Sequence, residues 1–236
     1  MALSLWSTQW AVLLLSLLYA FFPLFRYSIN IGFIERPLVQ GVIWGAITGQ
    51  PMIGFNIGVF FELLWLDLFP AGTFIPPQSV FAVFASTVLV RSLSAVRPEE
   101  IFLIMLVCIP FAFLGSWFEN RQREWQNKNY NLLLRWASNK QGHSHPQKMV
   151  LTSISQQFIL NFVFGAATLY LLLFAGQKLL PYLPAAEFFT WPMAWLAAAI
   201  GGIMSLRLRR AYALFFCGLA GAAGVMCAGW LNLLPV

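Results

Sequence analysis

The stretch that decides the fold runs from residue 41 to residue 72 and reads GVIWGAITGQPMIGFNIGVFFELLWLDLFPAG. Glycines recur four residues apart on both sides of Pro51, at Gly41, Gly45, Gly49, Gly54 and Gly58. Residues spaced by four share one ridge of a helix, and small residues on such a ridge let helices pack closely in a bilayer. The proline interrupts the first helix. The stretch therefore predicts a broken or re-entrant pair of helices, whose irregular backbone is protected by protein or lines a cavity.

The composition places the chain in a membrane. Hydrophobic residues make up 60% of the sequence and charged residues 9%. The apolar residues form runs of about the 20 residues that a helix needs to cross a bilayer. The first run, residues 5–25, lacks a basic n-region and an Ala-x-Ala cleavage site, so we predict a retained span. We expect an all-α integral membrane protein, a polytopic helical bundle that forms a single permease domain over residues 1–236.

Basic residues predict which side of the membrane the polar segment faces. The segment from residue 119 to residue 148 contains six basic residues but only two acidic ones, Glu119 and Glu124. This excess of basic residues predicts that the segment lies in the cytoplasm. Two further apolar runs, roughly 151–180 and 190–206, return the chain to the same side at a second basic cluster, Arg207, Arg209 and Arg210. The run before residue 119 then leads in from the far side, where we expect Arg91, Arg97, Glu99 and Glu100. The side of the N-terminus and the number of crossings before residue 100 stay open.

The polar segment from residue 119 to residue 150 is predicted to be a cytoplasmic amphipathic connector. Its apolar residues recur on one face of a helix that is otherwise rich in Arg, Lys and Asn, at Trp125, Leu132, Leu133 and Trp136. Such a helix rests in the headgroup region or docks a partner.

The remaining side chains form no pattern typical of catalysis or metal binding. Cys108, Cys217 and Cys227 stand singly in apolar runs, and His143 and His145 lie in a hydrophilic loop. The apolar runs hold no nucleophile with a matching base and no His-Glu-x-x-His spacing, which argues against an intramembrane enzyme. The net charge is +6, and the basic residues concentrate beside the hydrophobic spans. The orientation of the chain in the membrane therefore explains these residues better than binding to nucleic acid does. We predict a non-catalytic chain with no metal or cofactor.

Two carboxylates stand among apolar residues and need separate explanations. An ionised Glu62 would cost several kcal/mol if it faced lipid. It therefore faces protein, a cavity or a ligand, and serves either in binding or in a buried structural hydrogen bond. Asp67 is five positions on, about 140° round a helix, so the two cannot share one face. Asp67 precedes Phe-Pro-Ala-Gly, where the helix must end, and we expect it at a helix end or facing solvent.

Motifs along the first half of the chain resemble one family. In order they are Glu35-Arg36-Pro37-Leu38, Gly49, Gly54 to Gly58, Phe61-Glu62-Leu63-Leu64-Trp65, Pro70-Ala71-Gly72 and Pro76-Pro77. Their order and spacing resemble the membrane subunit IIC of the mannose/fructose/sorbose family of the phosphoenolpyruvate-dependent sugar phosphotransferase system. Weaker similarity continues at Ile109-Pro110, at Arg210-Ala211-Tyr212 and at Phe215-Phe216.

The resemblance implies a sugar-translocating permease subunit in the cell inner membrane. In that family IIC works with a second membrane subunit, IID, in a hetero-oligomer that carries a hexose across the bilayer. Soluble IIA and IIB proteins relay phosphate from phosphoenolpyruvate on their own histidines. The family fold pairs a core domain with a mobile V-shaped helical motif, and the broken-helix region would supply the pocket.

Where the sequence departs from the family pattern, it mostly has a neutral amide in place of an acid. Amides stand where the family usually has Asp, at Asn30, Gln50 and Gln78, while Asp67 replaces a residue that is commonly Gly. An amide both donates and accepts hydrogen bonds but carries no charge. A sugar hydroxyl can use either partner, so binding can survive, whereas transport coupled to phosphorylation is put in question. The alternative function is a diverged membrane scaffold or sensor of the same fold that moves no sugar.

The predicted substrate-binding residues are Glu62, Gln50, Asn56, Gln78, Trp65 and Asn30. A buried carboxylate at Glu62 can accept hydrogen bonds from two vicinal hydroxyls of a hexose at once. The amides would complete the hydrogen bonding, and Trp65 could stack on the apolar side of the sugar ring. These roles require the residues to converge in space. The sequence does not identify the sugar.

Overall fold

The computed structural model describes residues 9–26, 33–66, 68, 75–138, 146–182 and 189–205. Within these ranges all regular structure is helical, which confirms the all-α prediction. The elements in chain order are α2 (Gln9–Phe21), the short 3-10 helix η1 (Phe22–Arg26), α3 (Pro37–Thr48), α4 (Pro51–Leu64), α5 (Ser79–Ser92), α6 (Pro98–Ser138), α7 (Pro146–Leu179), the 3-10 turn η2 (Leu180–Tyr182) and α8 (Trp191–Ser205).

Several predicted features lie outside the described residues. They are Asn30 and Asp67, the loop with His143 and His145, Cys217 and Cys227, and the basic cluster Arg207, Arg209 and Arg210.

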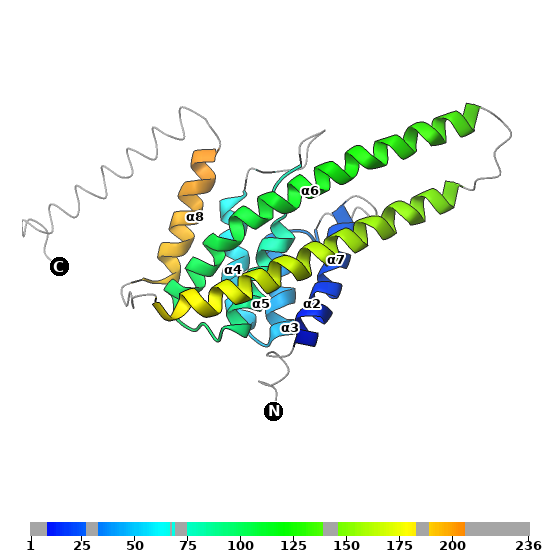
Figure 1. The fold of residues 1–236 in the computed structure, drawn as a ribbon. Coiled ribbons are helices and arrows are strands. Elements are labelled where there is room, and N and C mark those ends of the chain that lie inside the picture. Colours follow the sequence, from blue (N-terminus) through cyan, green and yellow to red (C-terminus); the bar gives the residue numbers. More distant parts are fainter. Residues whose placement is uncertain are drawn as a thin grey trace, which may run out of the picture.

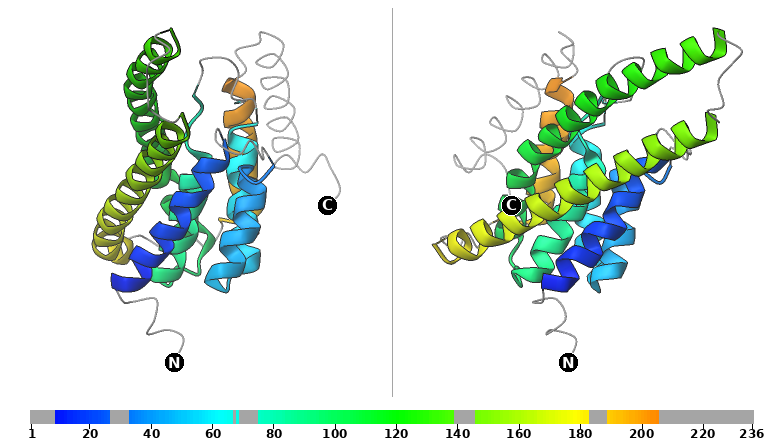
Figure 2. Two further views of the ribbon diagram at one scale, coloured as in Figure 1. Left: turned by 90° about the vertical axis from the view of Figure 1, so that its right-hand side faces the viewer. Right: turned by 45° about the vertical axis from the view of Figure 1, so that its right-hand side comes forward.

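Five short helices form a bundle, and two long helices cross it at an angle and project beyond it (Figure 1). At 41 and 34 residues, α6 and α7 are about 60 and 50 Å long. Their projecting part, residues 119–138 and 146–160, is called the arm here, and the end of the bundle nearest to it is called the arm end. In Figure 2, α6 and α7 lie on one side of the molecule and α3, α4 and α8 on the other, with α5 between them.

Residues 119–138 of the predicted connector are a continuation of α6, and residues 146–150 belong to α7. No Gly or Pro occurs between Gly115 and Ser138, so nothing in the sequence ends the helix where the polar residues begin. Gln126 Nε2 donates to the Ser153 carbonyl at 3.4 Å, which ties the two helices of the arm together.

Helix length separates two classes of element. The helices Pro98–Gln126 and Val150–Tyr182 are long and apolar enough to cross a membrane, because each contains an 18-residue stretch whose mean hydropathy is 2.4 or 2.1, respectively. By contrast, α3 and α4 have 12 and 14 residues, or about 18 and 21 Å, which is less than the roughly 30 Å of a hydrocarbon core. The two short helices are the broken pair that the glycine and proline spacing predicts.

The α3–α4 hairpin is packed backbone to backbone through its glycines. A Cβ atom at Gly41 would fall on the Gly54 carbonyl oxygen and lie 2.8 Å from Gly58 Cα. One at Gly54 would lie 2.5 Å from Gly45 Cα. The turn between the helices needs Gly49, whose φ of 73° is in the left-handed region. Only glycine lets these two helices approach so closely.

The core is built around α5, which is buried from Ser79 to Val90. A helix that is apolar on all sides belongs in the centre of a bundle. Tyr19 of α2 stacks on Phe84 of α5 with ring centroids 4.6 Å apart, and Trp44 of α3 packs on the same Phe84 at 4.7 Å. Helix α5 thereby joins α2 and α3 in one core.

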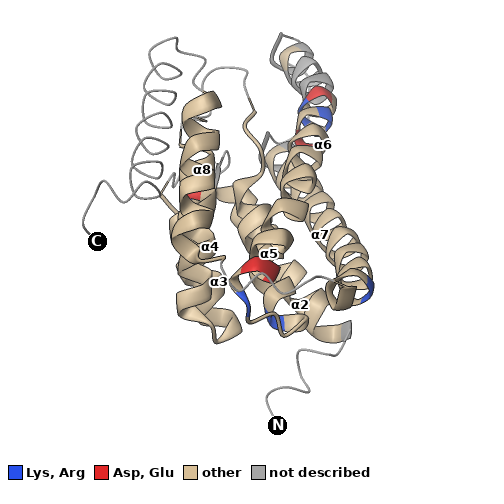
Figure 3. Ribbon diagram, turned by 90° about the vertical axis from the view of Figure 1, so that its left-hand side faces the viewer, with Lys and Arg blue, Asp and Glu red and all other residues tan. Residues whose placement is uncertain are grey.

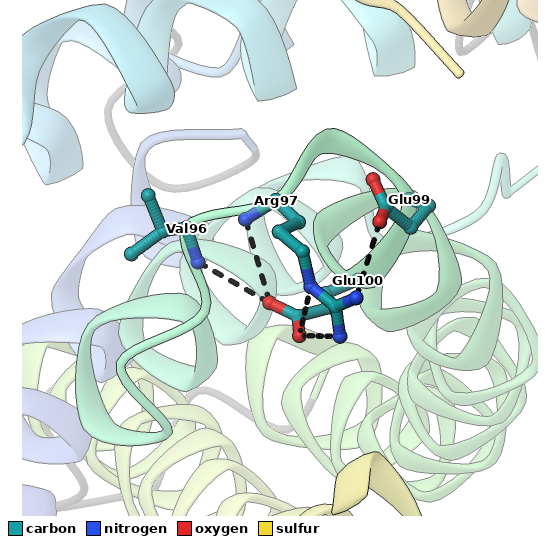
Figure 4. A network of polar contacts seen from close by, with 4 residues as sticks. All are labelled: Val96, Arg97, Glu99 and Glu100. Carbon is teal, nitrogen blue, oxygen red and sulfur yellow. Dashed lines mark hydrogen bonds and ion pairs between the residues drawn. The ribbon is translucent and has the colours of Figure 1, made fainter. Parts of the chain in front are cut away.

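Charged side chains gather at helix ends and along the arm (Figure 3). At the end opposite to the arm, Glu100 accepts hydrogen bonds from the backbone N–H groups of Val96 and Arg97 at 3.3 and 3.4 Å. The Arg97 guanidinium donates to the same carboxylate at 2.8 Å and pairs with Glu99 at 3.5 Å (Figure 4). The hydrogen bond to Glu100 raises the pKa of Arg97. This cluster caps the start of α6.

Candidate functional site

The carboxylate of Glu62 holds the two ends of the hairpin together. Its Oε1 accepts from Arg36 Nη1 at 2.9 Å and its Oε2 accepts from the Leu38 backbone N–H at 3.2 Å. Leu38 lies in the first turn of α3, where backbone N–H groups have no partner within the helix. Glu62, in the last turn of α4, supplies that partner from the neighbouring helix and complements the positive end of the α3 dipole.

The Glu62 carboxylate keeps acceptor capacity after these two contacts. A carboxylate has about four lone-pair sites, and the contacts to Arg36 and Leu38 use two of them. The side chain of Glu62 is 21% exposed and that of Arg36 is 42% exposed. The arrangement fixes the carboxylate in one orientation and leaves it partly accessible.

Gln78 forms the second polar centre at the arm end, in the core at the start of α5. The Tyr19 hydroxyl donates to Gln78 Oε1 at 3.0 Å, and the Gln78 backbone N–H donates to the Ala112 carbonyl at 3.0 Å. Glycines make room for both side chains. A Cβ atom at Gly115 would collide with Gln78 Oε1, and one at Gly165 would lie 2.7 Å from Tyr19 Cδ1. Gln78, at the start of α5, thereby contacts α2 through its side-chain amide and α6 through its backbone N–H.

Gln50 lies at the turn of the hairpin, where its backbone N–H donates to the Gly45 carbonyl at 2.8 Å. Its side-chain Oε1 is buried and accepts no hydrogen bond from the described part of the chain. A buried acceptor without a donor costs about 1–3 kcal/mol. The Gln50 amide oxygen thus lacks the donor that its burial calls for.

The other two candidates lie further along α4. Asn56 is half-buried, and its backbone carbonyl accepts from Trp195 Nε1 of α8 at 3.4 Å. Trp65 ends α4 and stacks on Phe61 with ring centroids 5.0 Å apart and an interplanar angle of 19°.

The structure brings some of the predicted site residues to one end and separates others. Glu62, Trp65 and Gln78 all lie toward the arm end, because Ser79, next to Gln78, donates to the Glu35 carbonyl beside Arg36 at 3.5 Å. Gln50 lies at the other end of the hairpin. It is twelve residues from Glu62 in one helix, so about 18 Å separates their backbones. The expected convergence of all candidates on one hexose is wrong for this pair, because the proline-initiated helix α4 runs straight between them.

Comparison with known protein families identifies the kind of protein. Residues 9–206 match the family described as the PTS system sorbose-specific IIC component, where PTS is the phosphotransferase system. The chain belongs to this family. It is a membrane protein and a IIC subunit of a sugar phosphotransferase system. Among curated protein sequences, none matches the chain.

A solved structure described as "Structure of membrane protein" has the same fold. It is 17% identical to this IIC chain, the match covers 95% of this chain and 94% of that one, and the TM-score is 0.56. The likeness concerns the fold alone.

Two residues of this IIC chain that complete the polar centres were not among the predicted site residues. Arg36 was part of the family motif, and its place just before Pro37 at a helix start could have indicated a cap partner. Tyr19 gave no signal, because it stands in an apolar run 59 residues before Gln78.

Proposed function

We propose that this IIC chain forms the sugar pathway of a mannose-family phosphotransferase complex together with a IID membrane subunit. Soluble IIA and IIB subunits supply the phosphate in this proposal, and a hexose is the substrate. The observation that carries the proposal is the α3–α4 hairpin within a chain of this family. Its short helices put helix termini and polar side chains at the two ends of a hairpin too short to span the bilayer, and broken helices of this kind commonly form substrate sites in transporters.

The proposed sugar site at the arm end centres on Glu62. Arg36 and the Leu38 N–H orient the carboxylate, and its two remaining lone-pair sites accept from vicinal hydroxyls. Because the carboxylate is already fixed, little conformational entropy is lost when the sugar binds. Trp65 and Gln78 lie toward the same end and complete this site, and Asn30, outside the described residues, remains a proposed member.

A second proposed contact lies at the turn of the hairpin. The unpaired Oε1 of Gln50 accepts from a sugar hydroxyl there, and Asn56 lies between the two ends. One hexose cannot span about 18 Å, so these residues serve successive positions of the sugar along the hairpin.

The alternative function is a membrane scaffold or sensor of the same fold that moves no sugar. One observation favours it: the Gln78 amide oxygen, which replaces an acid of the family pattern, is already bound to Tyr19. A side chain whose oxygen already accepts a hydrogen bond between two helices contributes less to the binding of a ligand.

We also propose the cell inner membrane as the location, several crossings, and a single membrane domain over residues 1–236. In this topology residues 119–150, which include most of the arm, lie in the cytoplasm, because this segment carries six basic residues from Arg121 to Lys148. The capping cluster around Arg97 and Glu100 then lies on the outer side.

Co-expression tests the function. The chain is produced with a IID subunit, and binding of radiolabelled mannose, fructose and sorbose to the purified complex is measured. We expect co-purification in mild detergent and saturable binding of at least one sugar, strongly weakened in Glu62→Gln. A stable complex that binds none of them supports the scaffold. A stable and active chain without any second membrane subunit contradicts the assembly.

A further inference from the structure

A groove of about 900 Å³ runs between α6 and α7 where the arm leaves the bundle. It extends along α6 from Leu114 to Trp125 and along α7 from Gln156 to Thr168. The groove includes the apolar parts of both helices, up to Phe118 on α6 and from Ile159 on α7, whereas residues 119–125 of α6 carry four charged side chains. Trp125, Ile159 and Val163, which line the groove, are 64%, 58% and 56% exposed. The groove is thus open to the surroundings of the two helices.

The groove is polar at one end and apolar at the other. Gln122, Gln156 and Trp125 lie at its arm end, while Leu114, Val163 and Ala167 line the rest. The hydroxyl of Thr168, at the far end, is turned back to the Phe164 carbonyl at 2.5 Å and offers the groove no donor. Tryptophan and amides are typical of the membrane interface, and the apolar part is typical of the hydrocarbon core.

One donor in the groove has no acceptor among the described residues. Gln122 is 5% exposed, and its Nε2 makes no hydrogen bond there. An unsatisfied amide in an apolar setting costs about 1–3 kcal/mol, so an occupant that accepts a hydrogen bond at this depth is favoured.

We propose that the groove binds a diacyl phospholipid of the leaflet on the arm side. An ester carbonyl of the lipid accepts from Gln122 Nε2, and an acyl chain follows the apolar lining toward Ala167. The nine residues of the apolar part of the groove on α7, from Ile159 to Ala167, rise about 14 Å, close to half of a hydrocarbon core about 30 Å thick. The polar end thus meets the ester region while the chain reaches the middle of the bilayer.

A transmembrane helix of a partner fits the groove less well. The backbone carbonyls of such a helix are bonded within it, so Gln122 would stay unsatisfied.

Photolabelling of the membrane complex tests the proposal. The complex is reconstituted into vesicles of phosphatidylethanolamine and phosphatidylglycerol. The vesicles contain a phosphatidylethanolamine probe with a diazirine near the end of one chain, in an ester-linked or an ether-linked form. Adducts are mapped and counted by mass spectrometry. We expect lipid adducts near Ala167. The ester-linked probe should give about two- to tenfold more adducts than the ether-linked probe, because only the ester offers a carbonyl group to Gln122.

Three variants distinguish the role of the Gln122 side chain from that of the apolar lining and provide a control. Gln122→Leu should keep the adducts but remove the preference for the ester. Ala167→Trp, which fills the apolar part, should reduce the labelling by both probes. Gln177→Leu, at an exposed glutamine near the other end of α7, is the matched control and should label as the unaltered chain does.

Three outcomes overturn the proposal. One is equal labelling by the ester and ether probes in the unaltered chain, and another is an ester preference that survives Gln122→Leu. The third is a photo-crosslink from residue 163 to a second membrane subunit without lipid adducts, which identifies a partner helix as the occupant. None of these outcomes depends on sugar transport.

Discussion

Replacing Glu62 by glutamine probes both contacts of this carboxylate and the proposed sugar site at once. The amide keeps the size and one acceptor oxygen, which can still bond the Leu38 N–H. Its NH₂ group then faces the Arg36 guanidinium, and two donors cannot bond each other.

The structure sets the expected magnitudes. Loss of the partly exposed ion pair and of charge at the α3 N-terminus should cost about 1–2 kcal/mol of stability. For a chain of this size that corresponds to a melting temperature lower by about 2–8 °C. Loss of a charge-assisted hydrogen bond to the sugar costs about 1.5–3 kcal/mol, so the Kd should rise about 10- to 150-fold.

Sugar affinity and melting temperature are measured on the same purified complex, with two matched variants. Arg36→Gln keeps the carboxylate but removes its ion pair, so it should lower the melting temperature and raise the Kd only about threefold. Glu100→Gln alters another glutamate that pairs with an arginine, at the opposite end of the bundle, and should leave the Kd unchanged. An unchanged Kd in Glu62→Gln would refute the binding role. Equal losses of sugar affinity in Glu62→Gln and Arg36→Gln would show that Glu62 acts only by holding α3 and α4 together.

Three further predictions follow from the packing and the charges. Gly41→Ala should prevent the close approach of α3 and α4 and cost about 1–3 kcal/mol or more in thermal unfolding. Gly201→Ala, where a new Cβ would meet only the end of a leucine side chain, should cost less than 1 kcal/mol. Tyr19→Phe keeps the aromatic stack but removes the donor to the buried amide at the start of α5, so the unfolding free energy should fall by about 1 kcal/mol. Cysteines at Ser138, the last residue of α6, and at Ser94, shortly before α6 begins, should react with a membrane-impermeant maleimide from opposite sides. Labelling of both from outside intact cells would contradict the topology.

The site could be predicted only in part, because some of its features follow from local sequence and others from contacts between residues far apart in the chain. Glu62 was recognisable from sequence, since a carboxylate in an apolar run must find a partner. The partner itself was not, because Arg36 and Glu62 are 26 residues apart and meet only when α3 and α4 fold back on each other. The separation of Gln50 from Glu62 likewise follows from the unbroken run of α4.

The amino-acid sequence by itself determined the membrane setting, the helical class and the hairpin. These follow from local properties: apolar runs of fixed length, glycines four residues apart and a proline that ends a helix. The family motifs added the kind of subunit.

Only the tertiary structure decided which polar groups face one another. Tyr19 reaches Gln78 because glycines in α6 and α7 admit both side chains, and the groove with its unpaired Gln122 exists because α6 and α7 continue past the short helices. Helical periodicity assigns a residue to a face of its own helix but carries no information about which helix will cover that face. Contacts between distant segments depend on how whole helices pack, and that is settled only when the chain is folded.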